Sequence, residues 1–171
     1  MVAKPLQAPK KLILFGPLLT LAEKWAKEIG MGTERMSAPM PDGTTTPFLM
    51  IKFGAYQVFV AEQRQGCIKV GLDIPIGDAA RQKLMNLSPE DKRKATTALR
   101  AELSSNPRAA YSWNPPNSAT LDQLQLLEIV ELLKIVESDV STFNRFIDAI
   151  QEVVTGGDKV FELFRRLESL P

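Results

Sequence analysis

The segment that decides the fold spans residues 47–74 and reads PFLMIKFGAYQVFVAEQRQGCIKVGLDI. It contains three apolar runs, at 47–53, 56–63 and 67–74, which are separated by short turn sequences. The connection at 54–55 has two residues with glycine first, which is typical of a type II′ hairpin turn. The third run alternates with the period of a strand that has one face in a core. The segment therefore predicts an antiparallel β-meander that is covered on one face.

The alternation in the third run also assigns its side chains to the two faces of the sheet. The core face is predicted to carry Ile68, Val70 and Leu72, and the other face Cys67, Lys69 and Gly71. Cys67 is the only cysteine, so it can form neither an intrachain disulfide nor a multi-cysteine metal cage. A reactive thiolate needs a helix N-terminus or a cationic neighbour, and Lys69 alone gives little support. We interpret Cys67 as a small residue that fits a sheet position.

A helix is predicted over residues 17–29, ahead of the meander. Apolar residues recur there at helical spacing, Pro17 suits the first helical position, and Gly30 suits a left-handed C-terminal cap. The lysines upstream and the apolar run 12–22 superficially resemble a secretory signal peptide. However, the sequence Gly16-Pro17 interrupts that run, and the amphipathic phase continues beyond it. We interpret the segment as a structural helix, and the run is too short to span a bilayer.

The segments that flank the meander are predicted from their composition. Residues 33–46 are polar and rich in proline and glycine, which predicts a loop. A short helix is expected over 79–85 and a longer one over 89–104. Ser88 should cap the longer helix by accepting a hydrogen bond from a backbone N–H two or three positions on. Residues 109–113 suit a fourth strand.

The last third of the chain contains one ambiguous segment and a helical end. Leucine and glutamate at 121–137 favour a helix, but polar residues recur every third position and β-branched pairs suit a bent strand. Asp139 or Ser141 is expected to begin a helix that is amphipathic. The glycine pair at 156–157 is expected to break or kink it, with Asp158 beginning a last helix.

These elements predict an α+β fold: an antiparallel β-meander sheet with helices packed on one face. We expect a single domain over residues 1–171, with 1–16 as an N-terminal extension and 158–171 as a C-terminal helical addition.

The order of elements resembles the small α+β fold of type III secretion chaperones, and more closely an archaeal family of uncharacterised proteins that shares this fold. The resemblance covers about residues 18–167 and rests on these stretches: WAKEIG at 25–30, IKVGL at 68–72, SPED at 88–91 and FNRFIDAIQEV at 143–153. It implies that residues 124–136 form mainly a strand and that the chain pairs as a homodimer. It carries no catalytic signature.

Composition excludes several kinds of chemistry. The chain has no histidine, so Ser-His and Cys-His nucleophiles and histidine-based metal sites are absent. Its 21 lysines and arginines against 20 acidic residues give a net charge of +1, so no global field attracts nucleic acid or an anionic membrane. The sequence identifies no catalytic, cofactor-binding or metal-ligating residue. The lack of paired cysteines fits a reducing compartment, and we expect a cytoplasmic protein without a cofactor.

The sequence leaves two alternatives to a protein-interaction module, and the first is an enzyme that uses carboxylates and a divalent metal. The carboxylate pairs Glu128/Glu131 and Asp148/Glu152 would each share a helix face and could flank a divalent metal or a substrate. Surface helices carry such pairs routinely, so we interpret them as solvated. The sequence GGDK at 156–159 lacks the glycine spacing and the Lys-Ser/Thr ending of a phosphate loop.

The second alternative is nucleic-acid binding through a local basic patch. This patch would consist of Lys92, Arg93, Lys94 and Arg100. Aromatic residues follow nearby, so phosphate contacts could combine with base stacking. Neighbouring acidic residues dilute the patch and the chain has no excess of positive charge, so we do not expect nucleic acid as a partner.

The hypothesis that we favour is a non-enzymatic protein-interaction module that self-associates or holds another protein. The expected partner is a second copy of the chain. Phe161, Phe164 and Leu167 would form one apolar stripe on a terminal helix, and Trp113 would anchor a rigid corner. Apolar area that the sheet leaves uncovered would then be buried in a two-fold pairing.

Overall fold

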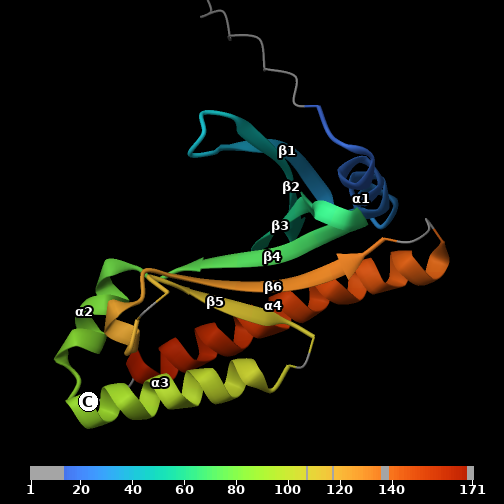
Figure 1. Cartoon of the computed structure of the whole chain (residues 1–171). Helices are drawn as coiled ribbons and strands as arrows, with labels where there is room; N and C mark the ends of the chain where they lie inside the picture. Colours follow the sequence, from blue (N-terminus) through green and yellow to red (C-terminus); the bar gives the residue numbers. More distant parts are fainter. Residues whose placement is uncertain (1–13, 107, 117, 136–138, 169–171) are drawn as a thin grey trace, which may run out of the picture.

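The computed structural model describes residues 14–106, 108–116, 118–135 and 139–168, which form one sheet and four α-helices (Figure 1). The elements in chain order are α1 (Pro17–Glu28), β1 (Gly32–Pro39), β2 (Thr45–Phe53), β3 (Tyr56–Gln63), the 3-10 turn η1 (Arg64–Gly66), β4 (Cys67–Pro75), α2 (Asp78–Asn86), α3 (Pro89–Ser104), β5 (Ala110–Asn114), the 3-10 turn η2 (Leu121–Gln123), β6 (Leu126–Lys134) and α4 (Val140–Glu168). The α+β class predicted from the sequence is therefore confirmed. Most of the predicted N-terminal extension, together with residues 169–171, lies outside the described residues.

The six strands lie in the order β1-β2-β3-β4-β6-β5, and every neighbouring pair is antiparallel. The first four strands form the predicted meander. At the β2–β3 turn Phe53 pairs with Tyr56, and Gly54 has a φ of 60°. Glycine adopts this left-handed conformation without the steric cost that a side chain would add.

The helices cover one face of the sheet. In Figure 1, α4 runs along β4 and β6, and α1 lies beside the β1–β3 end. The sheet residues buried on this covered face are Leu49, Ile51, Val58, Val60, Ile68, Val70, Leu72, Ile74, Leu127, Ile129 and Leu133. They share one apolar core with Phe146 and Ile150 of α4, which confirms the predicted phase of β4.

Two predicted helix boundaries are also confirmed. Ser88 is the N-cap of α3, and its Oγ accepts a hydrogen bond from the backbone N–H of Asp91 at 3.1 Å. Gly30 follows α1 with a φ of 76°, as expected for a left-handed residue after a helix.

The predicted loop at residues 33–46 is wrong in its first half, because β1 occupies Gly32–Pro39. This strand pairs with β2 over its whole length, from Gly32 opposite Lys52 to Pro39 opposite Thr45. It lies at the edge of the sheet and most of its side chains are exposed, so it shows no apolar alternation. Tertiary pairing therefore decides its structure against its local composition.

The predicted break at residues 156–157 is also wrong, since α4 continues through both glycines, and no separate helix begins at Asp158. The reason is close packing against the sheet. A Cβ on Gly156 would lie 3.1 Å from Ile129 Cδ1, and one on Gly157 would lie 2.5 Å from Leu72 Cδ2. The glycines therefore let the helix approach the sheet closely.

The ambiguous segment at residues 121–137 contains both short helical and extended structure. Leu121–Gln123 forms η2, and Leu126–Lys134 forms β6, in agreement with the strand implied by the resemblance. The fourth predicted strand is found one residue later than expected, as β5.

Candidate functional site

The residues predicted to form an interaction surface have different surroundings in the fold. Phe164 is buried in the core, whereas Phe161 has 45% of its surface exposed and lies 6.0 Å from the Tyr56 ring, centroid to centroid. Trp113 is half-buried in β5, with the Arg100 guanidinium 4.9 Å from its ring centroid. The side chain of Leu167 lies outside the described residues.

A shallow hollow of about 530 Å³ adjoins Phe161. The hydroxyl of Tyr56 donates a hydrogen bond to Asp158 Oδ1 at its rim. Burial, together with this neighbouring carboxylate, raises the pKa of Tyr56 to about 12. Tyr56 therefore stays protonated at neutral pH.

Three residues of the predicted basic patch have partners within the chain. Lys92 Nζ lies 3.2 Å from Asp122 Oδ2, in a pair whose side chains are each less than one-fifth exposed. Lys94 pairs with Glu90 at 2.8 Å, and Arg100 packs on the Trp113 ring. Arg93 is exposed. The four residues therefore do not form one unneutralised positive surface.

The opposite face of the sheet is covered by none of the described helices, and we call it the helix-free face. It carries an unexpected arrangement of apolar side chains. Residues directly opposite each other in antiparallel strands point to the same face, so the register defines rows that cross the sheet. One row on this face consists of Met36, Phe48, Ala61, Lys69 and Leu132, on β1, β2, β3, β4 and β6 respectively. Its end members are exposed, Leu132 by 64% and Met36 by 36%.

The next row crosses all six strands. It consists of Glu34, Met50, Phe59, Gly71, Val130 and Ala110. The ring of Phe59 lies over Gly71 and occupies the space that a Cβ would need. We call the two rows together the apolar band, because Glu34 and Lys69 are their only charged members.

Polar rows border the apolar band on both sides. On one side, the next positions along the strands are Lys52, Gln57, Asp73, Glu128 and Ser112. On the other side they include Gln63, Cys67 and Lys134. An apolar centre with a polar rim is typical of a protein interface.

Charged groups at the border of the band are bonded to one another. Lys69 Nζ donates to Glu128 Oε1 at 2.5 Å, and Ser112 Oγ donates to Glu128 Oε2 at 2.9 Å. The Lys69 ammonium also lies 5.4 Å from the Phe59 ring centroid. Burial raises the pKa of Asp73, and the charge of Glu128 directly opposite raises it further.

The sequence analysis did not find the apolar band. A signal was present, because β2 contains FLMI and β3 contains VFVA, which are continuous apolar runs. Such runs put apolar side chains on both faces of a strand. The band also contains Val130 and Leu132 of β6, and their place in it depends on the pairing of β4 with β6. That pairing is not readable from either segment alone.

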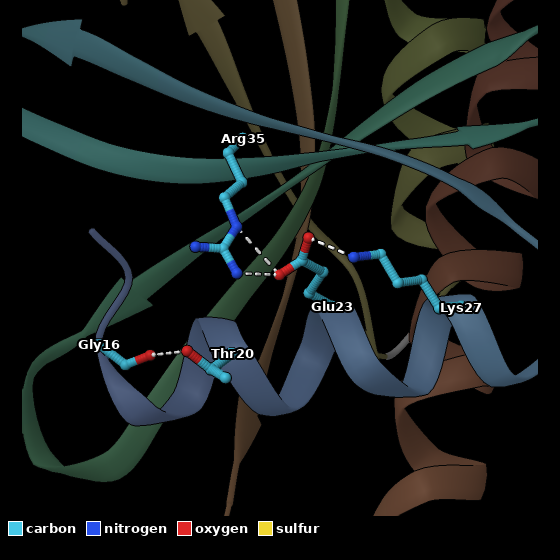
Figure 2. Close-up of polar contacts among 5 residues, drawn as sticks. All are labelled: Gly16, Thr20, Glu23, Lys27 and Arg35. Carbon is cyan, nitrogen blue, oxygen red and sulfur yellow. Dashed lines mark hydrogen bonds and ion pairs between the residues drawn. The ribbon is translucent and has the colours of Figure 1, made fainter. Parts of the chain in front are cut away.

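A second polar cluster lies on the covered face, between α1 and β1 (Figure 2). Glu23 is only 7% exposed, and its Oε1 accepts from Lys27 Nζ at 2.8 Å. Its Oε2 accepts from Arg35 Nε at 3.0 Å and from Nη2 at 2.5 Å. The hydrogen bond from Arg35 lowers the pKa of Glu23 below its usual range, against the opposing effect of burial. With every oxygen satisfied, this cluster ties α1 to the edge strand.

Among the described residues, no three or more carboxylate, cysteine or histidine side chains are placed to hold a metal ion. In the same part of the chain, no helix has both the length and the apolarity needed to cross a membrane.

Comparisons with known proteins give one fold match. No protein-family model and no curated protein matches the chain. A crystal structure of an uncharacterized protein from Methanothermobacter thermautotrophicus matches with a TM-score of 0.69 and 12% sequence identity, over 86% of this chain and 96% of the other. This match supports the archaeal part of the resemblance and gives no support to the secretion-chaperone part. At this identity it shows a shared fold alone: the chain is similar in architecture to an uncharacterized archaeal protein.

Proposed function

We propose that this protein is an interaction module that associates with a second copy of itself through the apolar band of the helix-free face. The observation that supports the proposal is the band itself. An antiparallel sheet covered on one side normally carries polar side chains on its solvated face. Here the two central rows are apolar, and Leu132 is 64% exposed.

The dimensions of the apolar band suit a protein partner. Six strands at a spacing of about 4.8 Å give it a length of about 25 Å, and two rows give it an area of about 300 Å². The largest apolar patch on a typical monomer measures about 300–600 Å² and is often functional. The polar rows on both sides would add the rest of the surface that a stable dimer buries.

The charges at the border favour a second copy of the chain as the partner. A two-fold axis along the band would exchange the two polar rows between copies. Asp73 and Glu128 of one copy would then face the row that contains Lys134 of the other. The same patch thus supplies both the acidic and the basic side of the contact, as an isologous interface requires.

Light scattering after size-exclusion chromatography tests the proposal. We expect a mass of twice 19.0 kDa at micromolar concentration for the native chain. Leu132→Asp should give the monomer mass and still unfold cooperatively, because this exposed side chain adds little to the monomer core. It should lose only the part of the melting temperature that rises with protein concentration in the native dimer.

Phe161→Glu is the matched control, since Phe161 is another exposed apolar residue but lies on α4 at the hollow beside Tyr56. It should leave the dimer intact. A monomer at all concentrations in a tenfold dilution series would refute self-association. Dissociation by Phe161→Glu but not by Leu132→Asp would refute the apolar band as the interface.

A further inference from the structure

A cavity of about 270 Å³ lies between the end of α3, the start of β5 and the middle of α4. Its lining includes Leu103, Asn106, Tyr111, Ile129, Glu152 and Lys159. Since a water molecule occupies about 30 Å³ in the liquid, the space would hold a ligand of about nine non-hydrogen atoms. A small organic molecule therefore fits it, whereas a peptide segment does not.

Residues without large side chains keep this cavity open. Gly156 lines it from α4, and Ala109 lines it from the segment before β5. The ring of Tyr111 and the side chain of Ile129 give it apolar walls, so the middle of the cavity suits a hydrocarbon stem.

One end of the cavity carries two carboxylates. Glu152 lines it, and its Oε2 accepts a hydrogen bond from Asn106 Nδ2 at 2.7 Å. Glu131 lies close by, and its Oε2 is buried without a hydrogen-bond partner among the described residues. Burial raises the pKa of Glu131, and the charges of Glu152 and then Asp148 raise it further, while Arg108 and Arg145 act in the opposite direction.

At the other end of the cavity, the charge of Lys159 is already paired with a carboxylate. Lys159 Nζ lies 3.3 Å from Glu102 Oε1 and donates to Ser105 Oγ at 3.2 Å. Lys159 follows Glu152 by two helical turns, which places it about 10 Å away along α4. It therefore does not compensate the carboxylates at the far end.

We propose that this cavity binds a small organic cation, an aliphatic guanidinium or amine with a short apolar stem. The cationic group would bond to Glu152 and offset the charge of Glu131 behind it, and the stem would lie between Tyr111 and Ile129. A charged hydrogen bond in a partly buried site and an apolar stem together suit a ligand of this class. The proposal does not rest on the apolar band: Glu152, Tyr111 and Ile129 lie on the covered side of the sheet, and among the lining residues only Ala110 also belongs to the band.

The probe is 1-butylguanidinium, and its matched control is N-butylurea, which has the same size but no charge. We expect butylguanidinium to shift the backbone amide NMR signals of Tyr111, Thr155 and Gly156 in a saturable way. A Kd on the order of 1 mM is ordinary for so small a ligand. Butylurea should bind roughly tenfold more weakly or not at all, because it lacks the charge.

Two variants assign the effect to the cavity. Glu152→Gln should weaken butylguanidinium binding roughly tenfold, since the amide keeps the shape but loses the charge. Glu90→Gln removes an exposed carboxylate from α3, outside the cavity, and should leave the affinity unchanged. Equal binding of butylguanidinium and butylurea, no saturable shift, or an unchanged affinity in Glu152→Gln would each overturn the proposal.

Discussion

The two faces of the sheet use the same strands for different purposes. On the covered face, Val70 and its neighbours are fully buried under α1 and α4. On the helix-free face, the apolar band places Phe59 and Leu132 where none of the described helices covers them. Apolar side chains alone therefore do not identify the core of this fold, because both faces have them. The position of the helices decides which face stabilises the monomer and which remains available for contact.

A charge placed on each face in turn tests the difference between the two faces most strongly. Val70→Asp would bury an unpaired carboxylate in the core and should destabilise the chain by about 4 kcal/mol or unfold it. Leu132→Asp, on the other face, should change the free energy of unfolding of the monomer by less than about 0.5 kcal/mol. Any further loss comes from dissociation of the dimer and should vary with protein concentration. Urea denaturation followed by circular dichroism measures both, and similar losses in the two variants would contradict the assignment of faces.

An ion-paired carboxylate on each face gives a second test of the difference between them. Glu23→Gln on the covered side should cost about 2 kcal/mol, since a nearly buried carboxylate loses charged bonds to Arg35 and Lys27. Glu128→Gln on the helix-free face should cost less than about 1 kcal/mol, because the Lys69–Glu128 pair is more exposed. Denaturation midpoints at pH 7 compare the two.

The pH dependence of stability gives an independent check on Glu23. Its folded pKa lies below the ordinary value of 4.5, so its contribution is present above pH 4.5 and is lost as the pH falls through the folded pKa. Glu23→Gln should therefore lose less stability than the native chain between pH 5 and the acid limit. An identical slope in both proteins would show that the pair does not stabilise the fold.

Glycine-to-alanine substitutions should give the smallest difference in stability cost between the two faces. Gly157→Ala should destabilise by about 1 kcal/mol, because overpacking against the enclosed Leu72 outweighs the gain in helix propensity. Gly71→Ala displaces the half-buried Phe59 ring, which has no helix above it, so its cost should be about 0.5 kcal/mol or less. Both are best measured in the Leu132→Asp background, where dimerisation does not contribute, and a larger loss for Gly71→Ala would reverse this order.

The parts of the fold that could be predicted from the sequence are those with a local signal. The β2–β3–β4 meander has clear turns and apolar runs, and Ser88 has the side chain that an N-cap needs. The edge strand β1 has no such signal. Both of its faces are largely exposed, so its sequence does not alternate between apolar and polar residues. The glycine pair in α4 has a clear local signal, but the prediction from it was wrong. The tendency of glycine to end a helix is overridden here by close packing against Ile129 and Leu72.

The candidate sites depend still more on tertiary structure. In β6, polar residues every third position fit no single period because Glu128 and Lys134 lie on the helix-free face, whereas Glu131 lies on the covered face, opposite Val70. The apolar band requires the register of five strand pairs, and the cavity brings residues 102 and 159 together. No short segment contains this information.

The pairing of β4 with β6 has a consequence for the way the chain folds. The strands of the meander are joined by short connections, whereas β4 and β6 meet only after residues 76–125 have been looped out. Closing a flexible loop of this length costs about 3.5 kcal/mol of chain entropy, beyond a constant term, before the contacts of the ladder repay it. Local hairpins do not carry this cost, so the meander can assemble early. We expect the joining of β4 to β6 to be the slow and late step of folding.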